Sequence, residues 1–247
     1  MKRSLILVGL VLGFLRLGAI PAAGQTPIPR QKDGKPNLSG IWQVMNAAAW
    51  NVEDHNAQKD VPAGIGVVEG GVIPYLPAAA EERNENYANR ATRDPLNKCF
   101  MPGVPRITYL PYPFQIIQMP NFVMIMYEFR QLIRNIYINS KHPDGAIDWW
   151  LGDSRARWEG DTLVNDVIDL IEDTWLDKAG NFHSDQLRVI ERYTLTDADH
   201  IKYEATLEDP KVYSRPWKMS MILYRHKEPN LQLLEYECFA YEVLPPD

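Results

Sequence analysis

Alternating apolar and polar residues mark most of the chain after Cys99 and predict β-strands. Short, turn-rich links such as Glu159-Gly160-Asp161 separate several of the alternating segments. One more predicted strand precedes Cys99, at residues 38–44, and the proline-spaced residues 102–121 read as an edge or connecting segment. The strands predicted after Cys99 cover residues 122–129, 132–138, 155–158, 162–170, 187–196, 201–209, 217–225 and 231–241.

Consecutive strands with such short links cannot form a parallel sheet, because each parallel connection needs a long crossover. We therefore predict an all-β fold, an antiparallel up-and-down sheet that closes into a barrel and leaves no strand edge unpaired. Gly40 and Trp42, on the first predicted strand, resemble the G-x-W opening of lipocalin-type barrels. This resemblance favours a lipocalin/calycin-like barrel with an internal pocket over a two-sheet sandwich.

The N-terminal third is predicted to be rich in loops and to hold the one helix of the chain. Pro77 precedes a helical pattern over residues 78–91, whereas residues 47–76 contain many glycines and prolines. A chain of this length can bury a single large core. Residues 25–247 are therefore predicted to form one β-barrel domain.

Residues 1–24 have the three-part layout of a secretory signal peptide, with Lys2 and Arg3 first, an apolar run next and small residues last. The apolar run is too short for a membrane span, although an uncleaved anchor is the alternative. Cleavage after Gly24 removes Lys2, Arg3 and Arg16 and no acidic residue, so the net charge of −6 becomes −9. Periplasmic or secreted localisation follows, and so acidic a chain predicts neither a nucleic-acid nor a membrane partner.

The two cysteines, Cys99 and Cys238, either form a disulfide or are two separate buried thiols. Export to an oxidising compartment favours the disulfide. No second cysteine or histidine stands at metal-ligand spacing from either, so no metal site is predicted.

Carboxylates interrupt the apolar faces of several predicted strands. Glu191 shares a face with Leu187, Val189 and Tyr193, and Asp166 shares one with Val164. A partly desolvated Glu191 would have a raised pKa and suit a general acid, whereas pairing with a nearby arginine such as Arg188 or Arg192 is the alternative. Glu235 and Glu237 interrupt the last predicted strand in the same way.

The segment EDTWLDKAGNFHSD, residues 172–185, is the densest polar cluster of the chain. His183 is a candidate general base that Asp173 or Asp177 would orient. The alternating carboxylates also permit a calcium loop, although their spacing departs from the EF-hand pattern. The third interpretation is a polar loop over the mouth of a barrel.

Aromatic and basic residues supply candidate ligand contacts. Trp150, Trp158 and Trp175 lie close in sequence around two turns and could stack on a sugar or an aromatic ring, or could simply fill the core. Arg106 and Tyr112 are candidates for binding a polar or anionic group of the ligand.

Six long motifs resemble a family of secreted bacterial proteins of the acidobacteria type, to which we attach no reaction. They are KCFMPGVPR, PYPFQIIQ, WLGDSRARWEGDTLVNDV, DTWLDKAGNFHSDQLRVIERY, EDPKVYSRPW and LLEYECFAYE. This chain departs from the family pattern at Asn165, where the pattern has valine, and after Cys238, where the pattern has His-Glu. Asp173, Trp175, Asp177, His183, Ser184, Glu191 and Arg192 match the pattern.

Three functions follow as hypotheses. The first is an acid/base enzyme without cofactor, a lyase, isomerase, cyclase or hydrolase, that acts on a ring-bearing small molecule through His183, Asp173, Asp177 and Glu191. The second is a non-catalytic barrel that binds such a molecule through its tryptophans. The third is a structural module stabilised by calcium. The oligomeric state stays open.

Overall fold

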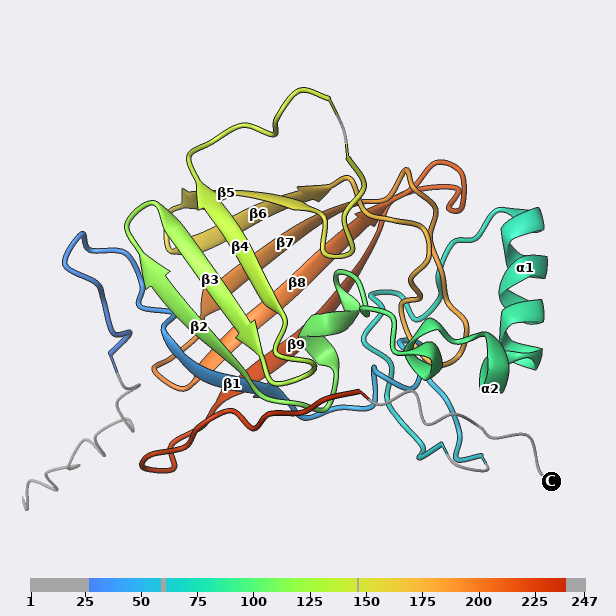
Figure 1. Cartoon of the computed structure of the whole chain (residues 1–247), viewed down its shortest axis with the longest axis horizontal. Coiled ribbons are helices and arrows are strands. Elements are labelled where there is room, and N and C mark those ends of the chain that lie inside the picture. The colour runs from blue at the N-terminus through green and yellow to red at the C-terminus, as the bar shows by residue number, and fades with distance from the viewer. Residues whose placement is uncertain (1–26, 59–60, 146, 239–247) are drawn as a thin grey trace, which may run out of the picture.

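The computed structural model describes residues 27–58, 61–145 and 147–238, and a closed nine-stranded barrel forms its body (Figure 1). This architecture confirms the predicted all-β barrel. The strands are β1 (Gly40–Val44), β2 (Phe114–Met119), β3 (Phe122–Tyr127), β4 (Ile133–Ile138), β5 (Asp153–Glu159), β6 (Thr162–Ile168), β7 (Arg188–Leu195), β8 (His200–Glu208) and β9 (Trp217–Arg225).

Each strand pairs with its neighbours in chain order, and β1 pairs with β9 to close the barrel. All of these pairs are antiparallel except β4 with β5, which is parallel. The prediction of a purely antiparallel barrel is wrong at this one pair. The link from β4 to β5 returns along the barrel and arches above its wall in Figure 1, as a parallel connection requires.

The structure decides the prediction that was left open for residues 102–121 and overturns one predicted strand. Residues 114–119 form the regular strand β2, because Pro113 and Pro120 flank this segment and do not interrupt it. Residues 231–238 contain no named strand, and Tyr236 makes only an isolated bridge to Phe129. Strands β1 and β9 already pair with each other and close the barrel, so neither terminal strand offers an edge to this segment. Residues 239–241 of that prediction lie outside the described residues.

The predicted helix is present as α1 (Pro77–Ala88), followed by one further turn, α2 (Arg90–Arg93). Two short 3₁₀ helices follow at Pro95–Lys98 and Arg106–Tyr109. Gly180 lets the segment after β6 approach α1, since a Cβ at this position would lie 2.7 Å from Cβ of Asn86. In the described part of the chain, no helix has the length and apolar character to cross a membrane.

The core fills the barrel with the inward side chains of its strands. In β8, buried and half-buried residues alternate along the whole strand, and the large rings of Trp42 and Phe114 are fully buried. At about 25 cal/mol per Å² of apolar surface, each such ring contributes a few kcal/mol to folding. Apolar burial therefore holds the barrel together, and polar groups in the lumen need a separate explanation.

Cys99 and Cys238 form a disulfide, which confirms the favoured alternative. The bond joins the segment after the barrel to the segment between the helices and β2, across a sequence separation of 139 residues. Closing a loop of this length is worth roughly 5 kcal/mol in the chain-entropy account.

Candidate functional site

The barrel wall opens between β4 and β5. These strands share only the register pairs Tyr137 with Arg155 and Ile138 with Ala156. Residues 133–136 and 152–154 form no ladder with one another, and a cavity of about 510 Å³ lies there. We call it the seam cleft, and it is lined by Met101, Ile133, Arg134, Asn135, Tyr137, Pro143, Trp149, Trp150, Leu151, Gly152, Asp153, Ser154 and Arg155.

Large apolar side chains form the outer part of the seam cleft and remain in contact with solvent. Trp149 is 55% exposed, Ile133 52% and Tyr137 43%. The ring of Trp150 packs edge-on against the ring of Phe100, with their centroids 5.3 Å apart. These exposed side chains give the outer end of the seam cleft an apolar surface.

Arg134 and Ser154 form the inner end of the seam cleft, because alternate residues of β4 and β5 point into the barrel. Each is only 2% exposed. The Arg134 guanidinium donates to Ser154 Oγ from Nε at 3.1 Å and from Nη2 at 3.0 Å. It also donates two bonds to the Glu191 carboxylate, at 3.1 and 2.5 Å.

Glu191 is saturated with hydrogen-bond donors. Besides Arg134, it accepts bonds from Asn165 at 2.8 Å, Tyr193 at 3.1 Å and Tyr203 at 2.8 Å. Burial alone would raise the pKa of Glu191, but the charge and bonds of Arg134 outweigh it and hold that pKa below its usual value. Glu191 lies inside the barrel, as the alternation predicted, but it is an ionised carboxylate and does not have the raised pKa expected of a general acid.

Sequence reasoning missed Arg134 as the partner of Glu191. The signal was present, because Arg134 shares the inward face of β4 with Ile136 and Ile138. A lone arginine on an apolar strand face requires a buried counter-charge.

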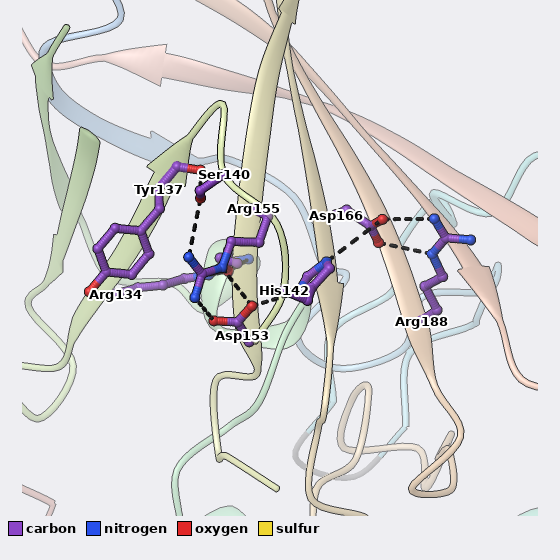
Figure 2. Close-up of polar contacts among 9 residues, drawn as sticks. Arg134, Tyr137, Ser140, His142, Asp153, Arg155, Asp166 and Arg188 are labelled. Atoms are coloured by element: carbon purple, nitrogen blue, oxygen red, sulfur yellow. Dashed lines mark hydrogen bonds and ion pairs between the residues drawn. The ribbon is translucent and has the colours of Figure 1, made fainter. Parts of the chain in front are cut away.

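A line of charged side chains crosses the outer wall beside the seam cleft (Figure 2). Arg155 makes two 2.7 Å bonds to Asp153, and His142 Nδ1 lies 2.5 Å from the same carboxylate. His142 Nε2 lies 3.8 Å from Asp166, which Arg188 holds with two bonds. Asp166 therefore points outward, contrary to its predicted place among apolar residues.

This charged line anchors the link between β4 and β5. His142 belongs to the link, whereas Asp153 is on β5 and Asp166 on β6. Burial alone would raise the pKa of Asp153, but its bonds to Arg155 and His142 lower it, so this carboxylate stays ionised. The same link carries Trp149 and Trp150, and the contacts of His142 thus help to position the rings of the seam cleft.

A second cavity of about 510 Å³ lies between α1 and residues 172–184, and we call it the helix cleft. Three residues predicted from the sequence line it, namely Asp173, Trp175 and His183. Its other lining residues are Glu82, Asn86, Arg93, Pro95, Lys98, Phe100, Glu172, Phe182, Ser184, Lys211 and Val212.

Hydrogen bonds inside the protein fix the tautomer of His183. Nδ1 lies 2.8 Å from the carbonyl oxygen of Ser184, which can only accept, so Nδ1 carries the hydrogen. Nε2 then accepts the hydroxyl of Thr174 at 2.7 Å. Burial lowers the pKa of His183, so the ring is neutral at pH 7. A carbonyl and a hydroxyl hold this ring, and neither of the predicted aspartates is bonded to it.

Asp177 organises its own loop and does not contact His183. It accepts bonds from the backbone N–H groups of Val52, Ala179 and Asn181 and from the Asn181 side chain. Burial raises the pKa of Asp177 to about 6. Within the described residues, no group of three or more His, Cys, Asp or Glu side chains is arranged to hold a metal ion.

The remaining predicted ligand contacts lie apart from both clefts. Arg106 is buried in a two-bond ion pair with Asp94, at 2.9 Å for each bond. The ring of Tyr112 packs on that of Tyr236, with their centroids 4.6 Å apart, and the ring of Trp158 lies under Lys35. Of the predicted tryptophans, Trp150 is therefore in the seam cleft and Trp175 in the helix cleft.

Comparison with models of known protein families and with curated protein sequences gives no match for this chain.

Proposed function

We propose that the protein binds a ring-bearing small molecule in the seam cleft. The observation that carries the proposal is the opening between β4 and β5, which has exposed rings at its outer end and buried hydrogen-bonding groups at its inner end. Small-molecule sites are typically concave, mostly apolar and equipped with a few convergent polar groups. The volume of the seam cleft, about 510 Å³, suits a molecule of one to three rings.

Two further features support a secreted or periplasmic binding protein. The disulfide between Cys99 and Cys238 is typical of proteins that fold in an oxidising compartment. The layout of residues 1–24 and the resemblance to secreted bacterial proteins support the same localisation.

The test is a thermal-shift and fluorescence titration with a panel of soluble ring compounds. We expect at least one compound to raise the melting temperature and to change tryptophan emission, since Trp149 and Trp150 line the cleft. Trp149→Ala should weaken binding about tenfold, in keeping with loss of one large stacking ring. Trp158→Ala, outside the cleft, is the control and should retain affinity. Equal loss in both variants would contradict the proposal.

A second candidate is acid/base catalysis in the helix cleft, which the fixed tautomer of His183 favours. A neutral ring whose Nε2 carries the lone pair is suited to accept a proton once the Thr174 hydroxyl turns away. His183→Gln should abolish turnover of a substrate found by screening, while that substrate still binds. Unchanged turnover would exclude this role.

A further inference from the structure

We propose that the ligand of the seam cleft carries a carboxylate, and that Ser154 and Arg134 bind this group at the inner end of the cleft. This inference rests on the proposed binding at the same site. It adds the chemical class of the ligand and the direction in which the ligand lies, with the ring outward and the carboxylate inward.

The hydroxyl of Ser154 is buried and is used only as an acceptor in the hydrogen bonds of the described residues. Its oxygen accepts two bonds from Arg134. Ser154 is almost fully buried and lines the cleft, so its own hydrogen is available to an acceptor that enters there. A buried donor of this kind is costly unless something pairs with it, and an acceptor on a ligand would do so.

The acceptor oxygens of Glu191, behind this point, are already occupied. Glu191 accepts five bonds from Arg134, Asn165, Tyr193 and Tyr203, so it has no room for a donor from the ligand. Asn165 Oδ1 and Tyr127 Oη are also buried without a partner, but neither residue lines the seam cleft. The inner end therefore offers donors to a ligand, and an acceptor group fits it best.

The guanidinium donors of the lining favour an anionic acceptor. Arg134 and Arg155 both line the cleft, although Glu191 and Asp153 already pair with them. Bonds from a charged donor to a carboxylate are stronger than bonds between neutral groups. Glu191 already binds the Arg134 guanidinium on the side of the barrel lumen, so a ligand would compete with it for this charge. We therefore expect selectivity for carboxylates rather than very tight binding.

The test compares three probes that share one ring: indole-3-acetate, indole-3-acetamide and indole. Isothermal titration calorimetry of the full mature protein should give a dissociation constant for the acid about tenfold lower than for the amide or the unsubstituted ring. Ser154→Ala should reduce this preference to less than about threefold. Ser214→Ala is the matched control, because Ser214 is exposed and donates only to the carbonyl of Pro74.

The outcomes separate the two proposals. If the acid and the amide bind wild-type protein equally, and Trp149→Ala weakens both, the seam cleft binds rings but the carboxylate assignment is wrong. If none of the three probes binds, both proposals fall. If Ser154→Ala does not fold, the ratio of acid to amide affinity in wild-type protein decides by itself.

Discussion

The side chains at the centre of the lumen show how a charged pair is kept inside an apolar barrel. Arg134 and Glu191 are almost fully buried, and four further groups share their hydrogen bonds, namely Ser154, Asn165, Tyr193 and Tyr203. Such a pair contributes little net stability, but removing one partner leaves an isolated buried charge. Strand alternation alone predicted that Glu191 faces inward. Its lowered pKa depends on Arg134. The pattern within a single strand does not reveal that Arg134 lies close to Glu191.

Arg134→Met should therefore destabilise the protein by about 3–5 kcal/mol, because Glu191 is left buried and unpaired. The free energy of unfolding in urea measures this change. Arg188→Met is the matched control: it breaks the half-exposed pair with Asp166 and should cost less than about 1 kcal/mol. Similar losses in the two variants would contradict the proposed role of burial.

The pH dependence of stability tests the neutral state of His183. Its folded pKa is lowered by burial from the ordinary 6.5, so the unfolded chain takes up the proton first as the pH falls. The stability that the neutral ring contributes is thus complete above the unfolded pKa and is lost as the pH falls toward the folded pKa. Between pH 7 and pH 5, wild-type protein should lose stability relative to His183→Gln. Asp177 titrates in both proteins, so its contribution cancels in the comparison. Parallel curves of unfolding free energy against pH for the two proteins would contradict a buried neutral ring.

The seam cleft arises from one pair of strands, β4 and β5. Their parallel direction is possible because the link between them is long, and their two register pairs leave residues 133–136 of β4 and 153–154 of β5 without a ladder between them. Alternation along the chain placed both strands, because each has a clear inward face. It could not reveal their relative direction, which depends on the path of the link through space. The same limitation explains the strand predicted at residues 231–241, whose alternation is real but whose described residues form no ladder with the barrel.

Gly152 controls the entry into β5 at the edge of the seam cleft. It has a φ of +66°, and a Cβ there would lie 2.6 Å from Val167 Cγ1 and 2.8 Å from the carbonyl oxygen of Ile168. Gly160, in the next hairpin, has a φ of +59° but no neighbour within 4 Å. Gly160→Ala should cost about 1–2 kcal/mol, the ordinary penalty of the left-handed conformation. Gly152→Ala should cost about 2 kcal/mol more through steric overlap, and equal melting temperatures would contradict this explanation.

For the whole molecule, the disulfide ties the chain after β9 to the segment before the barrel strands β2–β9. Residues 226–238 contain no named strand and are held by the bond between Cys238 and Cys99 and by the contacts of Tyr236 with Tyr112 and Phe129. The pattern of the complete chain predicted the barrel, since many consecutive strands with short links have few other ways to bury their faces. The two clefts could not be predicted. The helix cleft is formed by segments far apart in sequence, and the seam cleft depends on how the link places β4 beside β5.

Replacing both cysteines, Cys99→Ser with Cys238→Ser, should lower the free energy of unfolding by about 2–5 kcal/mol. The barrel itself should survive, as its strands close without the bond. Far-UV circular dichroism should therefore remain that of a β protein while the melting temperature falls. A variant that melts like wild-type protein would show that the bond contributes little to folding.

Photolabelling tests the central claim, that a ring-bearing molecule binds in the seam cleft, most directly. Benzophenone-4-carboxylate presents a ring system and a carboxylate, and it inserts on irradiation into C–H bonds that it touches. Mass spectrometry of the digested protein should find the label on the peptides that contain Ile133 to Tyr137 or Trp149 to Arg155, with competition by unlabelled indole-3-acetate. A label that is concentrated on α1 or on residues 172–184, or spread evenly over the surface, would contradict the account.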